Sequence, residues 1–132
     1  MSPIADMLIR IKNAQATGAG RVEVPFSKSK FTIANILKST GYLESVERTA
    51  KKDKKTEHDY LELGLRYVEG TPAIDGIRIM SRPSRHLYVK SSDIRPVRSG
   101  HGIALFSTSQ GIMTSADARK QKLGGEILFE IW

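Results

Sequence analysis

Apolar residues recur at two different spacings along this chain, and the change from one spacing to the other constrains the fold most strongly. Near the N-terminus they recur at helical spacing, at Ile4, Met7, Leu8 and Ile11, as expected for a helix with one buried face. In the second half they alternate with polar residues, as in residues 77–80 and 87–90, which is typical of half-buried strands. A chain with both periods is predicted to be an α+β protein.

The first half is predicted to have the order α-β-α-β-β. Ser2-Pro3 is a typical helix start, and Gly41 is a typical residue just after a helix. We expect helices from Pro3 to just before Thr17 and over residues 27–40, and strands over residues 22–24, 42–49 and 60–65. Residues 50–59, AKKDKKTEHD, are too polar to pack, so we predict a solvated hairpin loop there.

The chain is predicted to form two small lobes. Glu69-Gly70-Thr71-Pro72 is a turn-forming cluster between periodic segments, which places an N-terminal α/β lobe at 1–68 and a C-terminal β-rich lobe at 69–132. The second lobe is expected to be mostly antiparallel β with short helices. Ser92-Asp93 is expected to cap a helical turn through Val97, and Ser115 a short helix. The expected strands span residues 77–80, 87–90, 103–106, 111–114 and 126–132.

Composition excludes several kinds of protein. The 132 residues include no cysteine, so disulfides, thiolate zinc sites and cysteine nucleophiles are absent. No apolar run approaches the roughly 18 residues of a membrane helix, and the N-terminus does not have the pattern of a secretory signal. These features lead us to expect a cytoplasmic protein without a membrane partner.

Part of the positive charge is clustered in one stretch of the chain, between Arg78 and Gly102. Lysine and arginine total 21 against 14 acidic residues, a net charge of +7, which favours a polyanionic partner. One stretch, opposed only by Asp93, is local enough to form a face. This basic cluster consists of Arg78, Arg82, Arg85, Lys90, Arg95 and Arg98. Arg82 and Arg85 are therefore candidate phosphate contacts.

Motifs for catalysis are weak. Ser27-x-x-Lys30 matches a nucleophile pattern, but its partner motifs S-D-N and K-T-G do not occur, and a helix cap explains the serine better. The three histidines do not have metal-ligand spacing. We expect no enzyme activity, no cofactor and no metal. A small hydrolase that uses Ser27 or a hydroxyl of residues 107–109 remains as an alternative.

Three segments carry groups suited to RNA recognition. Ser107-Thr108-Ser109-Gln110-Gly111 offers hydroxyls and an amide that can bind base edges and 2′-hydroxyls, or it is a polar turn that satisfies its own backbone. Tyr88 can stack on an unpaired base, or it packs across strands. Gly124-Gly125-Glu126 offers bare amides and an acceptor for a guanine or cytosine amino group, or it is a helix stop with a surface acid.

Four stretches carry a resemblance that covers the whole chain: SPIADMLIRIKNA, VPFSKSKFTIANILKSTGYL, GIALFSTSQGIMT and ARKQKLGGEILFEIW. They closely resemble the family of bacterial-type protein eight of the small ribosomal subunit. The resemblance implies a primary binder of the central domain of 16S ribosomal RNA that helps assemble the platform. It also implies contacts with small-subunit proteins five and twelve and, in some members, repression through the messenger RNA of the protein's own operon. A free-standing translational regulator is therefore an alternative.

The resemblance also implies which residues bind. The S-T-S turn and the G-G-E segment would be the main contacts to an irregular internal loop in an RNA stem, with Tyr88 beside them. Ser29 and Lys30 would be contacts from the first half. The chain departs from the family pattern at Ser2, at Ser84-Arg85-His86 and at His101, which concerns mainly the surroundings of Tyr88.

Overall fold

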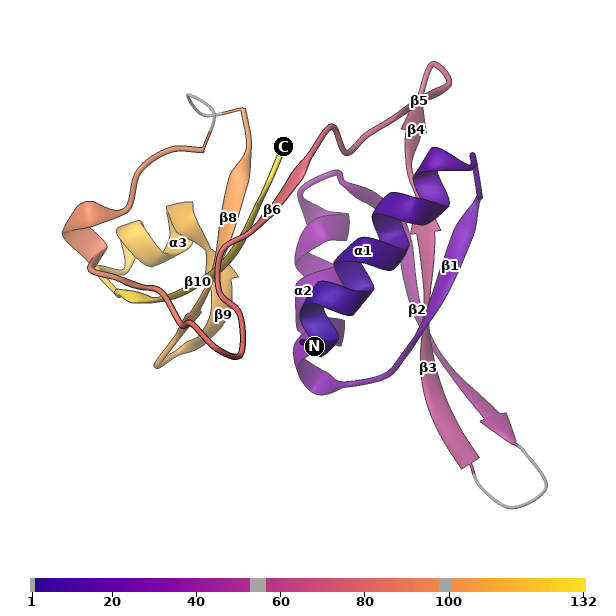
Figure 1. Cartoon of the computed structure of the whole chain (residues 1–132), viewed down its shortest axis with the longest axis horizontal. Helices are drawn as coiled ribbons and strands as arrows, with labels where there is room; N and C mark the ends of the chain where they lie inside the picture. The colour runs from indigo at the N-terminus through magenta and orange to yellow at the C-terminus, as the bar shows by residue number, and fades with distance from the viewer. Residues whose placement is uncertain (1, 53–56, 98–100) are drawn as a thin grey trace. The chain divides into compact units, whose positions relative to one another are not determined.

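The computed structural model describes residues 2–52, 57–97 and 101–132. The chain combines helices with antiparallel strands (Figure 1), which confirms the predicted α+β class. Two compact units are present, Pro3–Ala73 and Ile74–Trp132. None of the helices in the described ranges is both long and apolar enough to cross a membrane.

The N-terminal unit is a three-stranded antiparallel sheet with two helices on one face (Figure 1). The sheet has the order β1-β3-β2. Its elements are α1 (Pro3–Ala16), β1 (Arg21–Pro25), α2 (Lys28–Ser39), β2 (Leu43–Lys52) and β3 (Glu57–Leu65). The helix faces and the alternating strand residues bury one core, which includes Met7, Leu8, Ile11, Val24, Ile33, Leu37, Leu61 and Leu63. The predicted order α-β-α-β-β is confirmed.

The ends of α2 follow from local chemistry. Ser27 is the N-cap, and its Oγ accepts a hydrogen bond from the backbone N–H of Lys30 at 3.2 Å. At the other end Gly41 has a φ of +90°, which favours glycine because side chains with a Cβ rarely adopt it. Both residues agree with the helix cap and the helix stop that the sequence predicts.

The predicted loop over residues 50–59 is wrong at both ends. β2 continues to Lys52 and β3 begins at Glu57, so that Ala50 pairs with Asp59 and Lys51 with His58. Backbone pairing does not require apolar side chains where a ribbon extends into solvent, and Arg48 forms an ion pair with Asp59 across the two strands. The remainder of the predicted loop, residues 53–56, lies outside the described residues.

A short hairpin follows β3. It consists of β4 (Tyr67–Val68) and β5 (Thr71–Pro72), and its turn places Glu69 and Gly70 at positive φ. The lobe boundary expected between residues 68 and 69 falls inside this hairpin, whereas the division between the two units comes after Ala73.

The C-terminal unit is built around its last strand. Its elements are β6 (Ile77–Ile79), β7 (Tyr88–Val89), the 3-10 helix η1 (Ser91–Asp93), β8 (Ile103–Thr108), β9 (Gly111–Thr114), α3 (Ser115–Lys120) and β10 (Gly125–Ile131). β10 pairs with β8 along one edge, and with both β7 and β6 along the other. The core beneath comprises Ile94, Val97, Ala104, Phe106, Met113, Ala118 and Ile127.

Two expected helix positions are corrected here. The helical turn ends at Asp93 rather than reaching Val97, since Ile94 is extended and Arg95 precedes a proline, which disfavours helical backbone. Thr114, not Ser115, is the N-cap of α3 and accepts from Asp117 N. Ser115 is buried, and its hydroxyl accepts from Ala104 N at 3.3 Å.

Candidate nucleic-acid interface

Three of the predicted RNA-binding residues lie side by side across three strands. Glu126 of β10 is directly opposite Tyr88 of β7 on one side and directly opposite Ser107 of β8 on the other. Residues directly opposite each other in an antiparallel sheet present their side chains on the same face. Tyr88, Glu126 and Ser107 therefore form one line across the sheet, which we call the recognition row.

Tyr88 is the most exposed member of the row. Its exposed fraction is 76%, whereas Leu87 and Val89 on either side pack against the core. Tyr88 therefore points away from its two apolar neighbours, on the opposite face of the strand. An exposed aromatic ring beside a carboxylate and a hydroxyl provides one stacking surface and two hydrogen-bonding groups within a single row.

Serine and threonine of the S-T-S segment have different surroundings. Thr108 is the last residue of β8 and pairs with Gly111. Its Oγ1 donates to Gly111 O at 2.8 Å and accepts from Gln110 N at 3.1 Å, so this hydroxyl holds the turn together. Ser109 and Gln110 are exposed in that turn. The alternation of side chains along β8 therefore stops at Thr108, because the chain reverses there.

Two glycines allow β10 to lie between β7 and β8. A Cβ at Gly125 would be 2.4 Å from Ser107 O, and a Cβ at Gly124 would be 2.8 Å from Val89 O. Atoms cannot approach so closely without displacement of the backbone. The glycines are thus required by the spacing of the strands, which local sequence does not reveal.

A hairpin beside Tyr88 carries two arginines. The backbone N–H of Arg82 donates to Arg85 O and that of Arg85 to Arg82 O, both at 2.9 Å, and both side chains are exposed. Ser81 connects this hairpin to β10, since its Oγ donates to Ile127 O at 2.5 Å and accepts from Leu87 N at 3.1 Å. Ser81 was missed in the sequence because nothing local distinguishes it from other surface serines.

The family model of ribosomal protein S8 matches residues 2–132 of this chain. The chain belongs to this family. Among its relatives, the small ribosomal subunit protein uS8 of Persephonella marina is 46% identical over 133 residues, which cover 98% of this chain and 97% of the relative. The proteins of the same name from Nitratidesulfovibrio vulgaris and Sorangium cellulosum are each 45% identical over 130 residues, with the same coverage.

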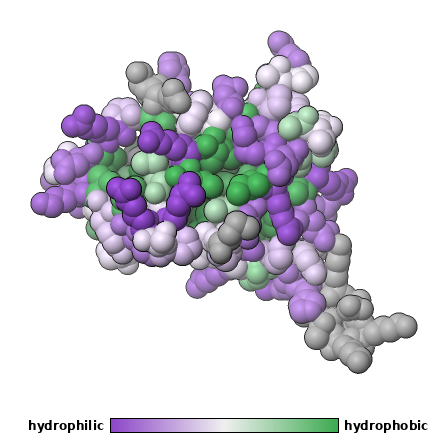
Figure 2. Space-filling model, viewed as in Figure 1, coloured by the Kyte–Doolittle hydropathy of each residue, from purple (hydrophilic) through white to green (hydrophobic). Residues whose placement is uncertain are grey.

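In this S8 family member, exposed cations lie close to Tyr88 of the recognition row along the chain, at Arg85 and Lys90. Five of the six residues in the basic cluster are exposed: Arg78, Arg82, Arg85, Lys90 and Arg95. Arg98, the sixth, lies outside the described residues. In the view of Figure 2, hydrophilic side chains gather over this unit, on the left. The unit therefore combines positive charge with a compact set of specific groups.

The two candidates in the N-terminal unit differ in exposure. Ser29 is exposed in the first turn of α2. Lys30 is only 7% exposed, and its burial, together with the nearby charge of Arg10, lowers its pKa from 10.5, an effect that Asp6 partly opposes. A buried side chain has little surface to offer an RNA phosphate, so Ser29 is the more accessible of the pair.

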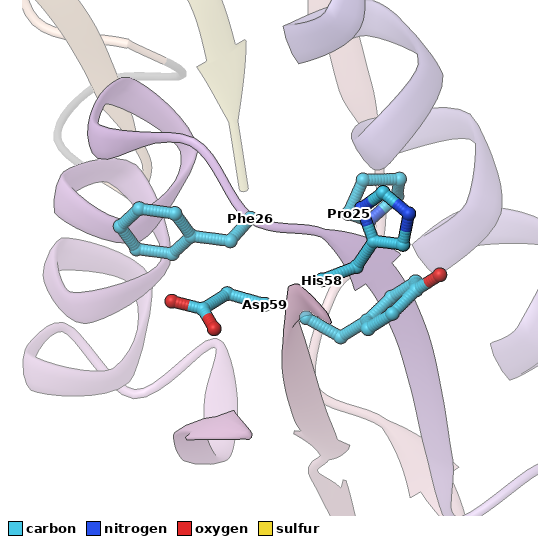
Figure 3. Close-up of a pocket in the computed structure, with 5 residues that line it drawn as sticks. Pro25, Phe26, His58 and Asp59 are labelled. Carbon is cyan, nitrogen blue, oxygen red and sulfur yellow. The ribbon is translucent and has the colours of Figure 1, made fainter. Parts of the chain in front are cut away.

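A hollow at the sheet end of the N-terminal unit offers no catalytic arrangement. It is lined by Pro25, Phe26, His58, Asp59 and Tyr60. Figure 3 shows Phe26 and Asp59 extending to one side and His58 to the other. The Arg48 guanidinium lies 3.8 Å from the centre of the Phe26 ring and also donates to Asp59. These contacts stabilise the base of the long hairpin.

Ser27, the serine considered as a nucleophile, has a structural role instead. Ser27 Oγ caps α2, which confirms the capping interpretation of Ser27-x-x-Lys30. Within the described ranges, no group of three histidine or acidic residues is placed to hold a metal ion.

Proposed function

We propose that this chain is a structural, RNA-binding component of the small ribosomal subunit, which binds the central domain of 16S ribosomal RNA and helps assemble the platform. Membership of the S8 family supports the small-subunit role. On this proposal the protein acts in the cytoplasm, on the ribosome, as a structural component rather than an enzyme. Small-subunit proteins five and twelve are its proposed neighbours, and the messenger RNA of its own operon is a further proposed ligand.

The observation that carries the proposal is the recognition row. Tyr88, Glu126 and Ser107 come from three separate strands, and no feature of the core requires a tyrosine, a carboxylate and a hydroxyl to be aligned at the surface. Unpaired RNA bases offer a π-face for stacking and polar edges for hydrogen bonds. The exposed arginines beside the row supply attraction to phosphates, which does not depend on base sequence.

The N-terminal unit is proposed to contribute a secondary contact through Ser29. Its hydroxyl is exposed in the first turn of α2, where backbone N–H groups and the helix dipole also favour an anion. In this proposal Lys30 contributes positive potential from beneath the surface, rather than a direct phosphate contact.

Substitution of Ser107 by alanine tests the proposal. Removal of a hydroxyl that is bonded to RNA leaves its partner unpaired, which costs about 1–3 kcal/mol, or roughly a fivefold to more than hundredfold loss of affinity. The loss is expected for the cognate stem of the 16S central domain and not for a scrambled duplex. Ser92→Ala, at an exposed serine of η1, is the matched control. Equal losses on both RNAs, or in both variants, would contradict a specific role of Ser107.

Sedimentation distinguishes the ribosomal role from that of a free-standing regulator. The untagged protein is expected to co-sediment with small subunits through a gradient at moderate salt. Its recovery at the top of the gradient, bound only to messenger RNA, would contradict the ribosomal role and favour the regulator.

A further inference from the structure

Glu126 has a side-chain partner that the proposed function does not use. Its Oε2 lies 2.8 Å from Nδ1 of His86. Glu126 is largely covered, with 18% of its side chain exposed, while His86 is 52% exposed. The contact joins residues 40 positions apart in the chain, and His86 is two residues before Tyr88. The contact therefore places His86 beside Glu126, the central residue of the recognition row.

A carboxylate is unfavourable in an RNA interface unless it accepts a specific hydrogen bond. When ionised it only accepts hydrogen bonds, and it repels phosphates. It can contribute favourably where it faces an exocyclic amino group of a base, as a glutamate does with the amino group of cytosine. Such a contact requires that one carboxylate oxygen be held in a defined direction, because a free glutamate side chain loses rotamer entropy when it binds.

His86 is placed to hold it. A hydrogen bond from Nδ1–H to Oε2 restrains the end of the Glu126 side chain, which leaves Oε1 as the oxygen directed at a ligand. The same bond requires the proton to be on Nδ1, as it is in one neutral tautomer and in the imidazolium. Asparagine at position 86 has a donor at a similar distance from the backbone, whereas alanine has none.

We propose that His86 is a positioning residue, which fixes the Glu126 carboxylate so that it accepts a hydrogen bond from the exocyclic amino group of a cytosine or guanine in the bound RNA. This inference rests on the proposed function. It assigns the specificity of the row at one base to a pair of side chains, of which only Glu126 contacts the RNA base.

The test compares His86→Ala and His86→Asn on two sets of RNA. One set is the cognate stem. The other set is made of variants of this stem with one base replaced at a time. A guanosine is replaced by inosine, or a cytidine by the nucleoside of pyrimidin-2-one, and each replacement removes one exocyclic amino group. The wild-type protein is expected to lose affinity about tenfold when the base at one particular position is replaced. His86→Ala is expected to bind the cognate stem about tenfold more weakly than the wild-type protein does, and its affinity is expected not to change when that base is replaced. His86→Asn is expected to restore most of both effects.

A double-mutant cycle separates positioning from general structure. In a Glu126→Gln background, His86→Ala is expected to have little further effect, because the carboxylate that it positions is gone. Arg85→Ala, which removes a neighbouring exposed cation, is the control, and it is expected to weaken all RNAs alike. If His86→Ala lowers thermal stability, the same test is made with His86→Asn and His86→Asp, which have side chains of equal size. The amide of the first can donate a hydrogen bond to Glu126, whereas the carboxylate of the second cannot.

The outcomes are distinguishable. If the unmodified protein binds cognate and scrambled stems equally, the proposed function fails, and the inference fails with it. The inference alone is overturned if the wild-type protein prefers the cognate stem and His86→Ala binds that stem with the same affinity. It is also overturned if the loss of affinity caused by His86→Ala is as large in the Glu126→Gln background as in the wild-type protein.

Discussion

Ser81 offers a direct test of how the recognition row is held in place. Its single hydroxyl makes two hydrogen bonds, one to Ile127 O and one from Leu87 N. Together they link Ile127 of β10 to Leu87, just before Tyr88, in addition to the direct backbone bond from Ile127 N to Leu87 O. Ser81→Ala removes the side-chain link and no group of the recognition row.

The expected magnitude follows from those two bonds. Each intramolecular hydrogen bond contributes about 0.5–1.5 kcal/mol net, so the loss of both is expected to lower the free energy of unfolding by about 1–3 kcal/mol. Ser84→Ala is the matched control, because Ser84 is exposed in the hairpin turn and a surface change of this kind is expected to stay within about 0.5 kcal/mol.

Tryptophan fluorescence in urea provides the assay. Trp132 is the one tryptophan of the chain, and it packs against the core of the C-terminal unit and over Gly76, where a Cβ would be 2.4 Å from the indole. Its emission therefore reports the unfolding of the unit that contains Ser81. If Ser81→Ala and Ser84→Ala shift the urea midpoint equally, the two bonds do not stabilise the unit and the reasoning is refuted.

Three further predictions concern sterics, buried charge and phosphate contacts. Gly125→Ala is expected to destabilise the C-terminal unit by about 1–3 kcal/mol in the same urea assay. Gly20→Ala, with nothing within 4 Å of the new Cβ, is expected to leave the urea midpoint measured by circular dichroism unchanged. Lys30→Met is expected to stabilise the protein at neutral pH, because the lowered pKa of Lys30 means that its charge is disfavoured in the folded state. The cost of the Lys30 charge to the folded state is present in full below the folded pKa and disappears as pH rises past 10.5. The gain in unfolding free energy from Lys30→Met, measured by urea titration, should therefore be smaller at high pH than at neutral pH; an equal gain at both would contradict this. If the five exposed cations of the basic cluster each contact one phosphate, a plot of log affinity against log salt should have a slope of about −3.5 to −4.5, and a flat plot would exclude phosphate contacts.

Much of the fold was predictable because its signals are local. The helical spacing of apolar residues identified α1 and α2, and the alternation of Leu61, Leu63 and Leu65 identified β3. Caps such as Ser27 and Gly41 act on their immediate neighbours, so the sequence shows them directly. The hairpin of β2 and β3 was underestimated because its outer pairs depend on backbone hydrogen bonds, which polar side chains neither reveal nor prevent.

The candidate site was predictable only as separate residues. Tyr88, Ser107 and Glu126 each have a side chain suited to RNA, but their alignment depends on the strand order β7-β10-β8, which does not follow the order of the chain. The contact between His86 and Glu126 depends on the same register. Thr108 was predicted to contact RNA, whereas its hydroxyl bonds the turn. The sequence does not reveal whether a hydroxyl in a turn bonds the backbone or a ligand.

The two glycines at the start of β10 separate the frame of this surface from the groups that it displays. Gly124 and Gly125 are constrained by carbonyl oxygens of neighbouring strands, so a larger residue is excluded whatever ligand is offered. Ser107 and Glu126 already carry a Cβ, so an exchange of their side chains does not meet this backbone contact. In a selection for binding to altered RNA stems, changes are therefore expected to accumulate in the recognition row while the glycines persist, and the strand frame could then be reused to read a different sequence.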